Sequence, residues 1–227
     1  MISESYYWRK EILKISNRIK RRVKNHKQWN DIDYGNFEKD IMFGFYIIRK
    51  LMEASKLDNK LCATNIECIV YRNNGKAINF RNNHRFFEFY DFENGNKQKC
   101  DLKFLINQFV HSYIFKPTFE VVDEKIIDLL EDENKSEEEK TELFCNSEKY
   151  VSGIYFNSDS NKRKSIYEIE VLKIIELFKA VGKCNITRVE MRFNGKKQDY
   201  DIVQYAEKMK LPSEIKKIID KFEHNNS

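Results

Sequence analysis

The residue best suited to acid–base chemistry is His111, because a neutral imidazole can accept a proton near pH 7. Asn107 lies four residues before it. Residues four apart on a helix face the same way, so the Asn107 amide could orient the imidazole or hold a phosphate oxygen. His111 and Asn107 are therefore the candidate catalytic residues. The alternative is a buried histidine on an apolar helix, hydrogen-bonded to a strand carbonyl.

The spacing of Asn107 and His111 resembles the motif of the HEPN ribonucleases, in which an Arg, a polar residue and a His on one helical turn direct the 2′-hydroxyl of RNA against its own phosphate. The resemblance covers one helix. The family's Arg has no counterpart, since Leu105 and Ile106 occupy its place and Lys103 is the nearest cation. The resemblance implies a metal-independent ribonuclease with a basic side chain supplied from elsewhere.

Positive charge is concentrated near the N-terminus. Residues 8–27 carry nine Lys or Arg against the single acid Glu11, a balance of +8. The same segment has helical periodicity, because five apolar residues recur at spacings of three and four: Trp8, Ile12, Ile15, Ile19 and Val23. We expect a helix over residues 8–24 that buries this stripe and leaves its cations in water, with Ser5 capping its start.

Cations displayed in this way bind nucleic-acid phosphates with a steep salt dependence. The candidate nucleic-acid contacts are Arg18, Lys20, Arg21, Arg22 and Lys24 from this helix, with Arg81 and Arg85 from a second basic stretch. The aromatic residues that follow Arg85 are either core or a platform on which single-stranded bases stack. Pairing with an acidic region of the same or another protein, and solubility alone, are the alternative uses of the charge.

Negative charge is concentrated in the middle of the chain. Residues 120–148 hold twelve Asp or Glu against three Lys, a balance of −9. Residues 133–142 contain no apolar side chain, so they form either an exposed acidic linker or the polar first turns of a helix that ends near Phe144. We place a boundary there, between halves at residues 1–132 and 143–227, although the two halves could also be one domain.

The elements that must position these residues show two periodicities. Helical spacing predicts helices over 37–56, 99–115, 167–182 and from Ser213, and partly helical spacing runs over 120–132. Aromatic and β-branched runs predict strands over 66–72, 84–92, 150–158 and 186–195. Asp101 would cap helix 99–115 and Pro117 would end it, while Gly182 would cap helix 167–182. Gly44 could permit close helix contact.

These elements lack a regular βαβ alternation, which predicts an α+β fold of about five helices on a small, mainly antiparallel sheet of four or more strands. Seven Gly in 227 residues form no phosphate-binding loop, and the Cys, His and acidic spacings match neither a zinc nor a calcium site. We therefore expect no metal and no cofactor. Without a signal peptide or an apolar membrane span, the chain is expected in the cytoplasm.

The sequence thus predicts a soluble cytoplasmic protein that contacts nucleic-acid backbone, with RNA the favoured polymer, through the basic helix at 8–24. A subunit that docks a protein partner is the alternative binding model. A metal-independent ribonuclease is the enzymatic alternative.

Overall fold

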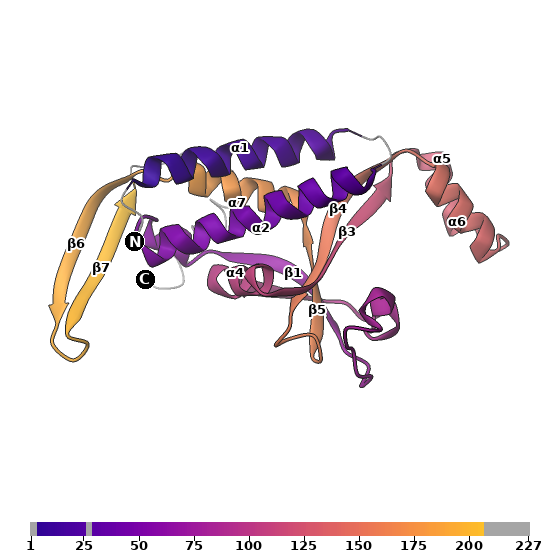
Figure 1. The fold of residues 1–227 in the computed structure, drawn as a ribbon. Coiled ribbons are helices and arrows are strands. Elements are labelled where there is room, and N and C mark those ends of the chain that lie inside the picture. Colours follow the sequence, from indigo (N-terminus) through magenta and orange to yellow (C-terminus); the bar gives the residue numbers. More distant parts are fainter. Residues whose placement is uncertain (1–3, 26–28, 207–227) are drawn as a thin grey trace.

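The structure, a computed structural model, describes residues 4–25 and 29–206 and is built around a five-stranded antiparallel sheet (Figure 1). Its strand order is β2-β1-β5-β4-β3, with β1 at Asn65–Arg72, β2 at Asn96–Asp101, β3 at Ser112–Val121, β4 at Lys149–Ser158 and β5 at Ser165–Glu170. A separate hairpin pairs β6 (Ile186–Asn194) with β7 (Asp199–Ala206). The predicted α+β class is confirmed.

The described chain also contains seven α-helices and one 3-10 helix, more than the five expected. They are α1 (Ser5–Val23), α2 (Asp31–Glu53), α3 (Asn59–Cys62), α4 (Leu102–Val110), α5 (Glu124–Glu131), α6 (Glu137–Asn146), α7 (Val171–Lys183) and the 3-10 helix η1 (Asn83–Glu88). The sheet takes β1, β2 and β3 from before residue 132 and β4 and β5 from after residue 143. Both halves of the sequence therefore contribute to one sheet.

The main core lies between one face of the sheet and helices α1, α2, α4 and α7. The apolar stripe of α1 packs into it as predicted, with Ile12, Ile15 and Ile19 fully buried. At its centre Phe109 stacks between Phe45 and Phe156, with ring centroids 4.1 and 4.3 Å away. Each buried Phe contributes roughly 1.5–3 kcal/mol to folding, so this layer fixes the position of the helices that carry the charged residues.

Two glycines let helices approach closely. A Cβ on Gly44 of α2 would lie 2.2 Å from the Phe178 ring of α7, so the predicted role of Gly44 is confirmed. The predicted role of Gly182 as a helix cap is wrong, because Gly182 lies inside α7 and Cys184 is the C-cap. A Cβ on Gly182 would lie 2.4 Å from Leu13 Cγ, so this glycine instead allows α7 to pack against α1.

The largest errors of the sequence prediction concern residues 84–115. Residues 84–92 form no strand, since Asn83–Glu88 is a 3-10 helix and Phe86, Phe89 and Tyr90 are buried at helical spacing in a second, smaller core. Asp101 caps α4 as predicted, but the helix ends at Val110 and Pro117 lies inside β3. β3 is an edge strand, where a proline is tolerated because one side of the strand has no partner.

Several smaller predictions also change. Glu4, not Ser5, is the N-cap of α1 and makes no side-chain cap. Of the two alternatives for residues 133–142, the first turns of a helix are confirmed and the linker is wrong from Glu137 on, because α6 begins there with a capping box between Ser136 and Glu139. The first residues predicted as helix 167–182 belong to β5, and β7 was not predicted. The helix expected from Ser213 lies outside the described residues.

Two arms project from opposite ends of the body (Figure 1). The helices α5 and α6 form one arm, and neither contains a buried residue. The hairpin β6–β7 forms the other, and it is tied to the body where Ala206 N donates to Asp58 Oδ2 at 2.7 Å. The charged helix α1 lies between these two ends.

Candidate nucleic-acid interface

The cations of α1 fall on separate flanks of the helix. Because a helix turns about 100° per residue, Arg18 and Arg22 lie on one flank and Lys20 and Lys24 lie on the other. The first flank faces α2 and the second faces α7, since Leu13, on the same flank as Lys20, contacts Gly182. The α2 flank contacts a buried carboxylate, whereas the α7 flank lies beside further cations.

On the α2 flank, both arginines bind the same buried carboxylate. Asp40 of α2 is 3% exposed. Its Oδ1 accepts from Arg18 Nη2 at 2.7 Å, and its Oδ2 accepts from Arg22 Nη1 at 2.6 Å. The hydrogen bond to Asp40 and the charge of Asp40 raise the pKa of Arg18, against a lowering by burial. Glu11 adds a longer contact, 3.5 Å from Arg18 Nη1.

This pairing changes the predicted interface. The expectation that Arg18 and Arg22 stand free in water is wrong, because both are held in ion pairs with Asp40 of the same chain. The partner is also not the acidic middle of the sequence. Among the described residues, no ion pair joins α1 to α5 or α6. Arg18 and Arg22 are therefore residues that hold α1 against α2.

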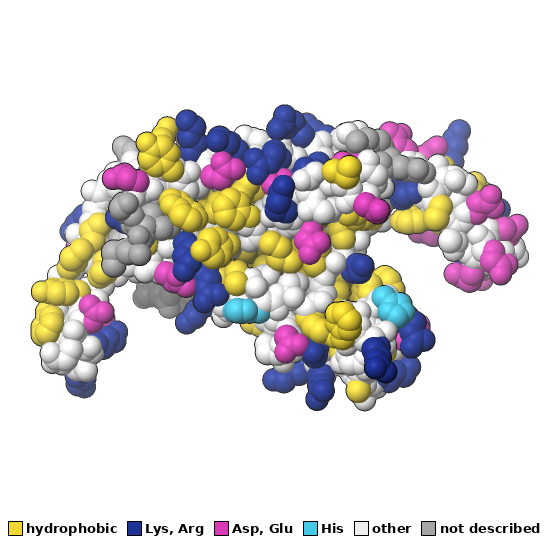
Figure 2. Space-filling model, viewed as in Figure 1, with side chains coloured by type: hydrophobic (Ala, Val, Ile, Leu, Met, Phe, Trp, Pro, Cys, Tyr) yellow, Lys and Arg dark blue, Asp and Glu magenta, His cyan; other side chains and the backbone are white. Residues whose placement is uncertain are grey.

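On the α7 flank, cations from two helices gather. Lys20 and Lys24 of α1 are exposed, as is Lys183 of α7, and Lys179 of α7 is half-buried. Arg21 stands on the exposed crest of α1. We call these five residues the basic ridge: Lys20, Arg21, Lys24, Lys179 and Lys183. In Figure 2, Lys and Arg side chains gather along the edge of the molecule that α1 forms.

The pKa of Lys179 shows how close these charges lie. Burial lowers this pKa first, and the positive charges of Lys20 and Lys183 lower it further, against an opposing effect of Glu176. Within residues 4–25 and 29–206, none of the five ridge residues forms an ion pair. The ridge is therefore a concentration of positive charge that the described chain leaves open to an external anion.

The sequence prediction missed Lys179 and Lys183. They stand four residues apart, so both lie on the outward side of α7. That spacing was a usable signal, but the sequence does not show that α7 packs beside α1. Asp40 was missed as well, and its effect is to remove two of the predicted contacts.

The predicted catalytic pair lies at the end of α4. His111 is the C-cap of the helix and is exposed, so the alternative of a buried histidine is wrong. Asn107 is also exposed, and its backbone carbonyl accepts from His111 N at 3.2 Å. Arg49 of α2 places Nη1 3.5 Å from His111 Nε2. The structure thus supplies a basic side chain from another helix, as the ribonuclease hypothesis requires.

Arg81 and Arg85 lie far along the chain from the ridge, in and before η1. Both are exposed, and Arg85 Nη1 lies 3.6 Å from Glu88 Oε1. The aromatic residues after Arg85 divide between the second core, which buries Phe86, and the surface, where Phe87 is 61% exposed. Among the described residues, no ion pair joins these arginines to α1, and the one that Arg85 forms is with Glu88 of its own helix.

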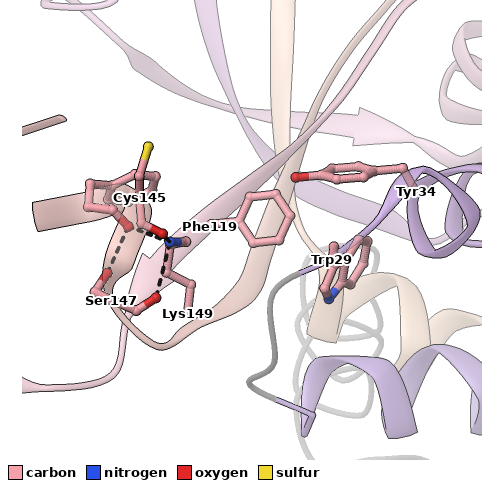
Figure 3. Close-up of a pocket in the computed structure, with 7 residues that line it drawn as sticks. Trp29, Tyr34, Phe119, Cys145, Ser147 and Lys149 are labelled. Atoms are coloured by element: carbon pink, nitrogen blue, oxygen red, sulfur yellow. Dashed lines mark hydrogen bonds between the residues drawn. The ribbon is translucent and has the colours of Figure 1, made fainter. Parts of the chain in front are cut away.

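An aromatic cavity of about 330 Å³ lies at the base of the α5–α6 arm (Figure 3). Trp29, Tyr34 and Phe119 form one wall, with ring centroids 5.3 to 5.9 Å apart. Opposite, Lys149 Nζ donates to carbonyl oxygens at the end of α6, including that of Cys145 at 3.0 Å. Its cation is therefore engaged by the protein, and the cavity adjoins the acidic arm, so we exclude it from the phosphate-binding surface.

In the parts of the chain that the structure describes, no three His, Cys, Asp or Glu side chains come together in a way that could hold a metal ion. The described helices also include none with the length and apolar character needed to cross a membrane.

Comparisons with known proteins add no further constraint. No family model matches the chain, and the searches of curated proteins and of solved structures find no match either. The function must be argued from the arrangement of the residues themselves.

Proposed function

We propose that the protein binds the phosphate backbone of nucleic acid, with RNA the favoured polymer, through the basic ridge. The observation that carries this proposal is the packing of α1 against α7, which places Lys20 beside the lysines of a second helix, Lys179 and Lys183, with none of the three in an ion pair among the described residues. Bringing like charges together costs free energy in the unbound protein. A polyanion would relieve that cost and release its own condensed counterions.

The ridge replaces the surface that the sequence alone predicted. Arg18 and Arg22 leave it because Asp40 holds them, and Lys179 and Lys183 join it. Lysines bind phosphate as point charges, and contacts to phosphate carry no sequence information, so the ridge would bind different sequences with similar affinity. Arg21, on the crest, adds a guanidinium that can bind phosphate in a bidentate manner.

The test is the salt dependence of binding to a fluorescently labelled oligonucleotide. Wild-type affinity should fall steeply with salt, with a slope of about −0.7 to −0.9 per phosphate contacted. The variant Lys20→Glu with Lys179→Glu should bind far more weakly. A matched control, Lys76→Glu with Lys99→Glu, reverses the same amount of charge at two exposed lysines of other elements and should bind normally. Affinity that is independent of salt would overturn the proposal.

A ribonuclease is the second candidate, favoured by the contact between Arg49 and His111. In such a reaction the His111 imidazole would take the proton of the 2′-hydroxyl, whose oxygen would attack the adjacent phosphorus. The bond from phosphorus to the 5′-oxygen would break, giving a 2′,3′-cyclic phosphate, and the 5′-oxygen would leave as a hydroxyl after taking a proton from water. Arg49 would bind the phosphate oxygens, although it also donates to Glu53 at 2.8 Å.

This second candidate makes a different prediction from simple binding. The purified protein should cleave RNA in the presence of a chelator, and His111→Ala should stop cleavage without weakening the binding of a non-cleavable DNA duplex to the ridge. RNA that stays intact with the wild-type protein would remove the ribonuclease candidate and leave the binding proposal in place.

A further inference from the structure

An apolar groove with a volume of about 450 Å³ lies between α2 and the end of α4. Its lining residues are Lys39, Met42, Phe43 and Tyr46 of α2, Phe109 and Val110 of α4, and Ser112 of β3. The volume is within the range of about 300–1,000 Å³ usual for small-ligand sites. Figure 2 shows hydrophobic side chains gathered below α1 on this face, with Lys and Arg beside them. The basic ridge lies on the other flank of α1.

Two aromatic rings of the groove are open to solvent. Phe43 is 42% exposed and Tyr46 is 39% exposed. Their rings lie nearly parallel, 14° apart, with centroids separated by 6.2 Å. Two parallel aromatic rings can continue a stack of bases. Any base can stack on them, because every base has a π face. Exposed and parallel aromatic rings are therefore suited to planar ligands.

Cationic and hydrogen-bonding groups border the groove. Lys39 lines it, and its ammonium group donates to an amide oxygen, that of Asn36, at 3.1 Å. Val110 of the groove directly precedes His111, whose imidazole lies 3.5 Å from Arg49 Nη1. A planar group in the groove would thus meet the cation of Lys39 in the lining and that of Arg49 beyond Val110. This combination of aromatic faces and flanking cations complements a base with its adjoining phosphates.

One acidic residue, Glu53, would compete with a phosphate for Arg49. Glu53 accepts from Arg49 Nε and from Lys50 Nζ, both at 2.8 Å. The Glu53 side chain is 46% exposed, so this pair is a surface ion pair of small net strength. A phosphate could replace Glu53 at little cost.

We propose that this groove binds an unpaired base of single-stranded RNA or DNA, with Lys39 and Arg49 contacting the adjoining phosphates. The inference rests on the proposed nucleic-acid function and deepens it, because the ridge alone would bind duplex and single strand alike. A base in a duplex is stacked on its neighbours and cannot enter the groove. The protein should therefore bind a single strand more tightly than a duplex of the same length.

The test compares the full chain's affinity for oligouridylate, oligothymidylate and an RNA duplex, measured by fluorescence anisotropy. Phe43→Ala and Tyr46→Ala should each weaken binding to both single strands by about 5- to 100-fold. Duplex binding should stay unchanged. Because both side chains are exposed, the variants should fold, and thermal unfolding verifies this. Phe193→Ala on β6, another exposed Phe, is the matched control and should bind like wild type.

Two further variants identify the occupant. Phe43→Leu keeps the groove apolar but removes the π face, so a base would bind weakly whereas an apolar peptide would be tolerated. Glu53→Gln removes the competing carboxylate and should tighten single-strand binding by about two- to fivefold, the range of a weak surface pair. Tighter binding of oligouridylate than of oligothymidylate would identify RNA as the natural source, and equal binding would show that base and phosphate suffice.

The proposal fails if Phe43→Ala and Tyr46→Ala bind single strands like wild type, or if Phe43→Leu retains full affinity. If the ridge variant alone loses binding, the proposed function stands and the groove is not a base site. If the wild-type protein binds neither polymer, both proposals fall. If Phe43→Ala lowers duplex and single-strand binding equally, the groove does not distinguish unpaired bases and this inference is wrong.

Discussion

The two flanks of α1 carry the same kind of residue and have opposite consequences. On the α2 flank, Arg18 and Arg22 share the carboxylate of Asp40, which is 3% exposed. On the α7 flank, the positive charges of Lys20 and Lys183 both act on Lys179. The first arrangement uses charge to join two helices, and the second leaves charge without a partner within the described chain. Charge density along a sequence therefore predicts a basic segment, whereas only the neighbouring helices determine what each cation does.

The largest effect should follow from removing Asp40. Asp40→Ala would leave two guanidinium groups without their carboxylate, and breaking a fully buried pair costs about 3–5 kcal/mol. The Arg18 side chain is 35% exposed and can turn to water, so we expect a loss of about 2–4 kcal/mol in the free energy of unfolding. Urea denaturation measures it.

A control separates charge from packing at this site. Replacing Asp40, Arg18 and Arg22 together by apolar residues of similar size removes the ion pairs without leaving an unpaired charge, and such replacements are often neutral or stabilising. A loss below about 1 kcal/mol for Asp40→Ala would show that the α2 flank is an ordinary surface and would end the comparison between the flanks.

The next largest effect concerns the α7 flank. Lys20→Glu with Lys179→Glu should weaken nucleic-acid binding by roughly 10- to 100-fold, which is about 1.4–2.7 kcal/mol. Folding stability should hardly change, because neither lysine forms an ion pair within the described residues. Anisotropy titrations and urea denaturation of the same sample give both quantities. If this variant unfolds as readily as Asp40→Ala, the two flanks do not differ in function.

Much of this comparison could be predicted from the sequence. The spacing of Ile12, Ile15 and Ile19 identifies α1 and its buried stripe, because helical periodicity is a local property. The sequence position of Asp40 also predicts that it needs a partner. It lies three residues after Phe37 and four before Gly44, on the buried stripe of α2, where an acid requires a partner. Two arginines four residues apart on another helix are a suitable partner, but the sequence does not show that α1 and α2 lie side by side.

Other parts of the fold could not be predicted from short stretches of sequence. The aromatic run in residues 84–92 predicted a strand, yet β1 pairs with β2 and β5, and Phe86, Phe89 and Tyr90 fill a separate core. Pro117 predicts the end of a helix unless the segment is known to be an edge strand, and strand order is a tertiary property. For the same reason the pairing of Arg49 with His111, sixty-two residues apart, has no sequence signal.

A smaller effect would show how many phosphates each flank of α1 contacts. Lys20→Gln should lower affinity about threefold at physiological salt and reduce the slope of log affinity against log salt by about 1, as expected when one phosphate contact is lost. Arg22→Gln, on the opposite flank, should leave the slope unchanged because its guanidinium is already held by Asp40. Equal reductions for both variants would mean that nucleic acid contacts both flanks and displaces Asp40.

The smallest expected effect is a pH dependence that comes from Lys179. Burial and the charges of Lys20 and Lys183 lower the pKa of Lys179 in the folded protein, so between that lowered pKa and about pH 10 the unfolded chain binds more protons. Stability should therefore rise with pH in this window. Phosphate binding favours the charged ammonium, so affinity should fall in the same window. Lys179→Arg, which stays charged, should abolish both trends, whereas Lys24→Arg should change neither. If stability and affinity fell together as the pH rose, the titrating group would not be Lys179. The conclusion that Lys20, Lys179 and Lys183 lie close together on this flank would then be wrong.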